Sequence, residues 1–122
     1  VPGSSAVYLG GVVAYTNNVK ASMLGVPGAL IRKEAAVSEA VAREVASGAR
    51  VRTGAGVGIS VTGIAGPSGG TPEKPVGTVF LALAGAFGTV AERKLNSYER
   101  EAFKQLTAQQ ALEMLRQRLI LA

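Results

Sequence analysis

A long segment rich in glycine and proline separates two apolar stretches near the middle of the chain. From Gly63 to Gly77 it contains five glycines and three of the chain's five prolines. Connections within compact domains usually take about 4–6 residues, and longer structureless ones are usually functional or disordered. Glycine lets a backbone approach a ligand closely, and proline stiffens the chain. The segment therefore predicts a loop that offers backbone N–H groups to an anionic or carbonyl-bearing ligand, with a long structural hairpin connection as the alternative.

The remaining segments predict an α/β fold. Strands are expected at residues 7–15, 56–61, 76–83 and 89–95, the last two forming an antiparallel hairpin around a turn at residues 85–88. A short helix capped by Asn17 or Asn18 should end at Gly25, a second should start after Ser38, and a final one should start in a capping box of Asn96 and Glu99. The periodicity predicts that these last two helices bury Val41, Ala42, Val45, Ala46 and Ala49, and Ala108, Ala111, Leu112, Leu115 and Leu119, respectively. The order of elements predicts a single domain over residues 1–122, an α/β sandwich with a mixed β-sheet.

The composition excludes several kinds of chemistry. The chain has no Cys, no His and, among its eight acidic residues, no Asp. Disulfides, thiolate chemistry, Cys/His zinc sites and serine–histidine catalysis are therefore excluded for these residues. An enzyme of this composition would use Lys, Glu or Tyr as its base, and we expect neither a metal nor another cofactor. No apolar stretch approaches the roughly 18 residues that a membrane span needs, so we expect no membrane partner and a cytoplasmic location.

The net charge of +5 is compatible with a nucleic-acid partner or with an anionic small substrate. The 13 basic residues are dispersed along the chain, and only six aromatic residues accompany them. No nucleic-acid-binding motif is present. Dispersed surface charge is the simpler interpretation, and a nucleic-acid partner is not expected.

The segment from Tyr15 to Lys20 is a second candidate for chemistry, because a strand is expected to end and a helix to begin there. Loops at strand ends are where α/β proteins place their sites. A lysine that serves as a general base must lose its proton near neutral pH, which burial or a neighbouring cation promotes. The alternative is that Lys20 is an ordinary solvated lysine in the first turn of a helix.

The start of the final helix is a third candidate. Arg100 lies between Glu99 and Glu101, where the positive end of the helix dipole would add to the attraction for an anion. The competing interpretation is a solvated charged face that includes Lys104.

Three stretches together resemble the signature segments of a known family. They are GGVVAYTNNVKASMLGV at residues 10–26, AVSE at residues 36–39 and SVTGIAGPSGGTPEKPVGTV at residues 60–79. These segments resemble the CinA C-terminal domain family, whose members are bacterial nicotinamide-nucleotide amidases. The resemblance implies a three-layer α/β/α domain that converts nicotinamide mononucleotide and water to nicotinate mononucleotide and ammonia without a metal.

The resemblance also implies roles for particular residues. In the family a serine in an ESCTGG-type motif on the first helix is the nucleophile, and the lysine of a YxNxxK motif activates it. The motif corresponds here to Tyr15, Asn17 and Lys20, so that Lys20 would be the base and Tyr15 would help to position it. The implied substrate-binding residues are Asn17, Thr62, Gly63, Gly66, Gly69, Gly70 and Arg100.

The chain departs from the family pattern at three places. No ESCTGG-like stretch occurs, so we expect the nucleophilic serine upstream of Val1; a non-catalytic nucleotide-binding or assembly module, or a DNA-associated factor, is the alternative. The family's GDR motif becomes Tyr98-Glu99-Arg100, and its GAVS segment begins here with Ala35. Without the first helix one side of the sheet would be uncovered. We therefore expect a homo-oligomer, and longer family members suggest an N-terminal partner domain.

Overall fold

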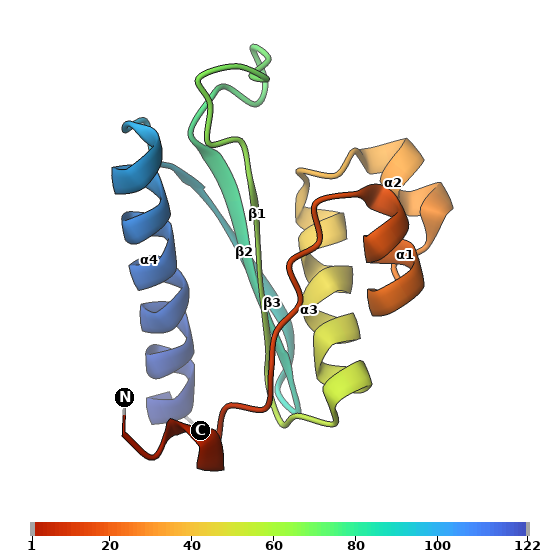
Figure 1. Cartoon of the computed structure of the whole chain (residues 1–122), viewed down its shortest axis with the longest axis vertical. Helices are drawn as coiled ribbons and strands as arrows, with labels where there is room; N and C mark the ends of the chain where they lie inside the picture. The colour runs from red at the N-terminus through yellow and green to blue at the C-terminus, as the bar shows by residue number, and fades with distance from the viewer. Residues whose placement is uncertain (1, 122) are drawn as a thin grey trace.

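The computed structural model describes residues 2–121 and has three layers (Figure 1). Helices α1 to α3 lie on one side of a central sheet and α4 lies on the other. The elements in chain order are η1 (Ser4–Ala6), α1 (Asn17–Leu24), α2 (Gly28–Glu34), α3 (Glu39–Thr53), β1 (Gly58–Gly63), β2 (Thr78–Gly85), β3 (Gly88–Leu95) and α4 (Arg100–Leu121). The predicted α/β class is confirmed.

The sheet is built around β2. The strand order is β1-β2-β3, and both pairs are antiparallel, which confirms the predicted hairpin. Every residue of β2 is buried, and its side chains alternate between the two faces. Phe80, Ala82 and Ala84 pack against α3, whereas Val79 and Leu81 pack against α4. The middle strand thus holds the two helical layers together.

Residues 7–15 do not form the strand predicted for them. Val7 lies in a turn, and residues 8–15 run as an extended stretch without regular secondary structure (Figure 1); they are mostly exposed, with Val13 76% and Tyr15 84% accessible. Gly10 and Gly11 lie in the middle of this stretch, where glycine costs backbone entropy and supplies no side chain to pack. Since the predicted first strand is missing, the three strands found among residues 2–121 are all antiparallel and the sheet is not mixed.

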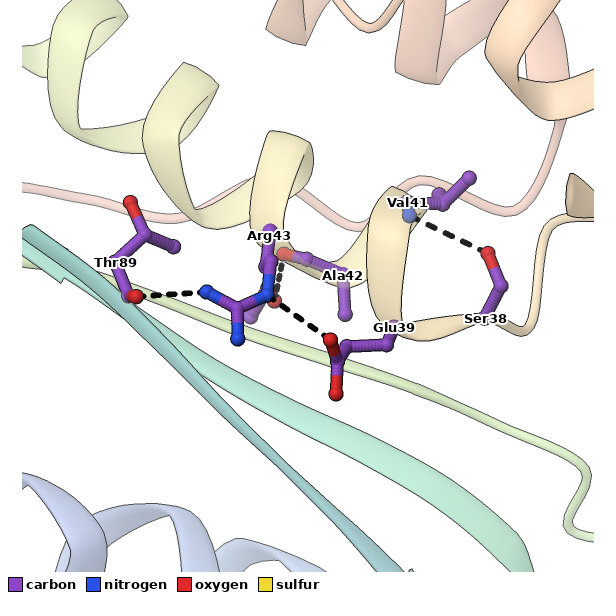
Figure 2. A network of polar contacts seen from close by, with 7 residues as sticks. Ser38, Glu39, Val41, Ala42, Arg43 and Thr89 are labelled. Atoms are coloured by element: carbon purple, nitrogen blue, oxygen red, sulfur yellow. Dashed lines mark hydrogen bonds and ion pairs between the residues drawn. The ribbon is translucent and has the colours of Figure 1, made fainter.

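The starts of α1 and α3 are fixed by hydroxyl caps. Thr16 Oγ1 accepts a hydrogen bond from the Val19 amide at 3.1 Å, so the cap of α1 is Thr16 and not Asn17 or Asn18. Ser38 Oγ accepts from the Val41 amide at 3.3 Å and caps α3 as predicted (Figure 2). Arg43 then ties α3 to β3, because its guanidinium donates to the Thr89 carbonyl at 2.7 Å.

Helix α4 is present as predicted, but its cap and its buried face differ. The carboxylate of Glu99 accepts from the amides of Glu101 and Ala102 at 2.9 and 2.7 Å, so Glu99 is the cap in place of Asn96. Of the predicted apolar face Ala111 is buried, Leu115 is half-buried, and Ala108, Leu112 and Leu119 are exposed. The buried face instead consists of Phe103, Thr107 and Ala111. The reason is that Val79 and Leu81 of β2 offer the surface on which Phe103 and Ala111 pack.

One helix, α2, was not anticipated from the sequence. It follows Pro27 and packs Ile31 into a cluster with Leu24, Val26 and Val41. Within residues 2–121 no helix is both long and apolar enough to cross a membrane.

Candidate functional site

An open cavity of about 1080 Å³ lies along β1. Its walls come from residues 7–15, from the C-terminal half of α3, from β1 and from Leu115 and Leu119 of α4. The cavity is of the size that holds small-molecule ligands, which usually occupy about 300–1,000 Å³. The exposed stretch at residues 7–15 is therefore one wall of a candidate site.

Lys20 lines this cavity and is almost fully buried. Its side chain comes from α1, whose start is fixed by the Thr16 cap, and only 8% of the residue is accessible. Within the described part of the chain its ammonium group has neither an ion pair nor a hydrogen bond. The interpretation of Lys20 as a solvated lysine is therefore wrong. A lysine whose side chain lines a cavity is placed where it can serve as a base or a nucleophile.

Three other predicted site residues share the cavity with Lys20. Tyr15 lies where the extended segment ends, and Thr62 and Gly63 lie where β1 enters the glycine-rich loop. The Thr62 hydroxyl donates to the Ala36 carbonyl at 3.1 Å. The structure thus brings Tyr15, Lys20, Thr62 and Gly63 to one cavity.

The remaining predicted residues lie outside the wall of this cavity. They are Asn17, Gly66, Gly69, Gly70 and Arg100. Arg100 is exposed, and its guanidinium donates to the Gly66 carbonyl at 3.4 Å. Gly66 and Gly70 pack against Val76 on the returning limb of the loop; a Cβ at Gly70 would lie 2.5 Å from the Val76 amide nitrogen. The absence of a side chain at Gly66 and Gly70 therefore allows the two limbs of the loop to pack against each other.

The loop itself is an ordered extension of the β1–β2 hairpin. The Ile64 amide donates to the Thr78 carbonyl at 2.9 Å, and the Gly77 amide donates back to the Ile64 carbonyl at 2.7 Å. At its tip, Thr71 and Lys74 exchange two hydrogen bonds, of 2.9 and 3.0 Å, that close a turn. The interpretation of residues 63–77 as a hairpin connection is therefore confirmed. Its end at Gly63 nevertheless borders the cavity.

A segment at residues 35–37, of which Ala36 and Val37 line the cavity, was not recognised as a cavity wall from the sequence. Each of its three carbonyls accepts a side-chain hydrogen bond: Ala35 from Ser38 Oγ at 2.8 Å, Ala36 from Thr62 Oγ1 at 3.1 Å and Val37 from Lys74 Nζ at 2.6 Å. The one available signal was that Lys74 is the only basic residue between Thr62 and Val79.

Ser60 also lines the cavity, but its hydroxyl is already engaged. It is 4% accessible, and Ser60 Oγ donates to the Ala42 carbonyl of α3 at 2.6 Å. This bond ties β1 to α3 and leaves Ser60 as a structural residue. Among residues 2–121 there is also no cluster of carboxylates that could hold a metal ion.

Comparison with known proteins gives a family for this arrangement. The family model described as the CinA C-terminal domain matches residues 1–119. This chain belongs to the CinA C-terminal domain family. The match spans all three layers and every wall of the cavity.

Named relatives of the CinA C-terminal domain family support the same conclusion. A CinA-like protein from Anaeromyxobacter sp. (strain K) is 54% identical over 116 residues, which are 95% of this chain and 28% of the relative. A CinA-like protein from Geotalea uraniireducens is 48% identical over 98% of this chain and 29% of the relative. The chain therefore spans less than a third of the length of these curated relatives.

Two solved CinA-superfamily structures have the same fold. The competence/damage inducible protein CihA from Agrobacterium tumefaciens superposes with a TM-score of 0.90 at 42% identity, covering 94% of this chain and 71% of that one. The competence damage-inducible protein A from Klebsiella pneumoniae superposes with a TM-score of 0.93 at 32% identity, covering 98% and 74%.

Proposed function

We propose that this domain is part of an amidohydrolase that deamidates nicotinamide mononucleotide to nicotinate mononucleotide and ammonia. The observation that carries the proposal is the position of Lys20, a largely buried residue that lines a cavity of ligand size and whose amine has no partner within residues 2–121. Membership of the CinA C-terminal domain family supports it. The signature-like segments at residues 10–26 and 60–79 supply Lys20, Tyr15, Thr62 and Gly63 to the cavity.

In the proposed reaction Lys20 is the general base for a serine nucleophile. The neutral amine accepts the serine proton while the serine oxygen attacks the carboxamide carbon of the pyridine ring. The same proton then passes to the leaving nitrogen, and ammonia departs from the acyl-enzyme. Water, deprotonated by the same amine, then attacks the ester carbon, and the proton passes from the amine to the departing serine oxygen, which releases nicotinate mononucleotide and restores the free serine and the neutral amine. Tyr15 would help to orient Lys20, and Thr62 and Gly63 would line the carboxamide pocket.

The nucleophile is proposed to lie outside the 122 residues. Ser60 is the serine that lines the cavity within the described chain, and its proton already bonds to the Ala42 carbonyl. A serine on a preceding segment could reach the open side of the cavity without breaking that bond. Asn17, Gly66, Gly69, Gly70 and Arg100 would bind substrate only through such a completed site, since they do not line the cavity.

The test is ammonia release from nicotinamide mononucleotide by the protein as its gene encodes it. Lys20→Ala should lower kcat/KM by about 10²-fold to 10⁴-fold, the usual contribution of a positioned base. Lys33→Ala is the matched control, because Lys33 is an exposed lysine of α2 outside the cavity and should leave the rate unchanged. If the purified, folded protein releases no ammonia, the proposal fails.

A second candidate function is binding without turnover. The engaged hydroxyl of Ser60 favours it, because these residues alone supply no free serine at the cavity. Calorimetry separates the two: binding of nicotinamide mononucleotide with no ammonia in the encoded protein supports the binding module. A DNA-associated function predicts instead an affinity for DNA that falls steeply with salt.

A further inference from the structure

The Lys74 side chain connects the glycine-rich loop to the wall of the cavity. It leaves the turn at residues 71–74 and places Nζ 2.6 Å from the Val37 carbonyl. Val37 lines the cavity and immediately precedes Ser38, the cap of α3. Among the three donors that hold the carbonyls of residues 35–37, Lys74 is the only charged one, and charge-assisted bonds are roughly twice as strong as neutral ones.

The wall at residues 35–37 needs to be held in place. Ala35 has φ 70° and ψ 158°, a region of backbone conformation that is essentially restricted to glycine. Such a conformation persists only where neighbouring contacts determine it, and it tends to occur near functional sites. The three hydrogen bonds to Ala35, Ala36 and Val37 are those contacts.

The tip of the loop is held from a second direction as well. Arg93 of β3 donates to the Glu73 carbonyl at 2.6 Å, so that neighbouring residues of the tip are tied to β3 and to the wall. Both cations also lie over the Phe80 ring, with Lys74 Nζ at 5.9 Å and the Arg93 guanidinium at 5.6 Å from its centroid. The reach of Lys74 toward Val37 is therefore preset by the fixed turn and by the ring.

We propose that Lys74 is a positioning residue for the site: it holds the cavity wall at residues 35–37 and couples that wall to the glycine-rich loop. The consequence for catalysis rests on the proposed amidase function, whereas the structural coupling does not. Lys74 does not itself line the cavity, so it acts through the Val37 carbonyl.

Hydrogen exchange tests the coupling directly. Lys74→Met removes the donor and keeps the aliphatic stem; amides in residues 35–42 and 64–77 should then exchange about tenfold faster or more, while those of β2 stay protected. Lys74→Arg keeps a cationic donor and should restore slow exchange. The matched control is Lys33→Met, because Lys33 is exposed on α2. The backbone amides of this variant should exchange at the same rates as those of the wild-type protein. If Lys74→Met does not fold, Lys74→Gln, which is too short to reach Val37, carries the same expectation.

The kinetic readout is a split between kcat and KM. Lys74→Met should lower kcat about tenfold with a smaller change in KM, because the wall moves relative to Lys20, and Lys74→Arg should recover the rate. Unchanged exchange at residues 35–42 in Lys74→Met, or equal acceleration in Lys33→Met, overturns the proposal. An inactive wild-type protein removes the amidase function and leaves the exchange experiment to decide the coupling.

Discussion

Asn96 and Gln110 exchange two hydrogen bonds between their side-chain amides. Asn96 Nδ2 donates to Gln110 Oε1 at 2.8 Å, and Gln110 Nε2 returns a bond to Asn96 Oδ1 at 3.2 Å. Asn96 Nδ2 also donates to Thr107 Oγ1 at 3.1 Å. The backbone N–H of Asn96 donates to the Gly77 carbonyl at 2.7 Å. A residue that is 3% accessible thus joins the end of β3, the returning limb of the loop and α4.

Replacing Asn96 by alanine should destabilise the domain by about 1–3 kcal/mol, because Gln110 and Thr107 would lose partners in a buried region. Urea unfolding with an unchanged m-value measures this loss. Ser97→Ala is the control, since Ser97 is exposed and its change should stay within about 0.5 kcal/mol. The double variant Asn96→Ala/Gln110→Ala should show coupling of at least about 0.5 kcal/mol. Fully additive losses would contradict a cooperative pair.

Ala35→Gly should stabilise the domain. Ala35 has φ 70° and ψ 158°, and backbone strain of this kind costs about 1–3 kcal/mol. Glycine would relieve the strain, but its greater conformational entropy stabilises the unfolded chain by about 0.4–1 kcal/mol. The net gain expected in the free energy of unfolding is about 1 kcal/mol. Ala40→Gly is the matched control in the first turn of α3, where the same exchange should be destabilising. A loss of stability in Ala35→Gly would show that the wall is not strained.

Much of the fold could be predicted because each strand and helix has a local cause. The Ser38 cap, the turn at residues 85–88 and the apolar run that becomes β2 all lie within short windows of sequence. The errors arose where tertiary contacts decide. Asn96 satisfies the local rule for a helix cap, yet its burial against Gln110 leaves that role to Glu99. Leu112 and Leu119 fit the period of α4, yet β2 selects the face that contains Phe103.

The candidate site could be predicted only in part. The local motif places Tyr15 and Lys20, and the resemblance adds Thr62, but the burial of Lys20 depends on how α1 packs on the other helices. The hydrogen bond between Lys74 and Val37 joins residues that are 37 positions apart, so no local sequence pattern predicts it. The same holds for Arg100 and Gly66, whose contact lies away from the cavity wall.

Gly48→Ala should destabilise the domain although it improves helix propensity. Alanine is usually about 1 kcal/mol better than glycine inside a helix. Here α1 crosses α3 so closely that a Cβ on Gly48 would run into the Leu24 backbone, with the carbonyl carbon at 2.9 Å. Overpacking of this kind costs about 1–3 kcal/mol. Thermal unfolding checks it against Ser47→Ala, a neighbouring change in α3 that should stay near wild type. A more stable Gly48→Ala protein would mean that α1 can move away from α3.

Acid should weaken the start of α4 through Glu99. The Glu101 amide, followed by the Ala102 amide, donates to the Glu99 carboxylate and holds its pKa below the ordinary value of 4.5. A lowered pKa means that the cap contributes fully above pH 4.5 and is lost as the pH falls through the lower folded-state value. Glu99→Gln should therefore be less stable than wild type at neutral pH, and this difference should shrink as the pH falls below 4.5. Unfolding curves measured across that range give the comparison, with Glu44→Gln on the exposed face of α3 as control. If the difference between Glu99→Gln and wild type stays constant with pH, the carboxylate cap is not the cause.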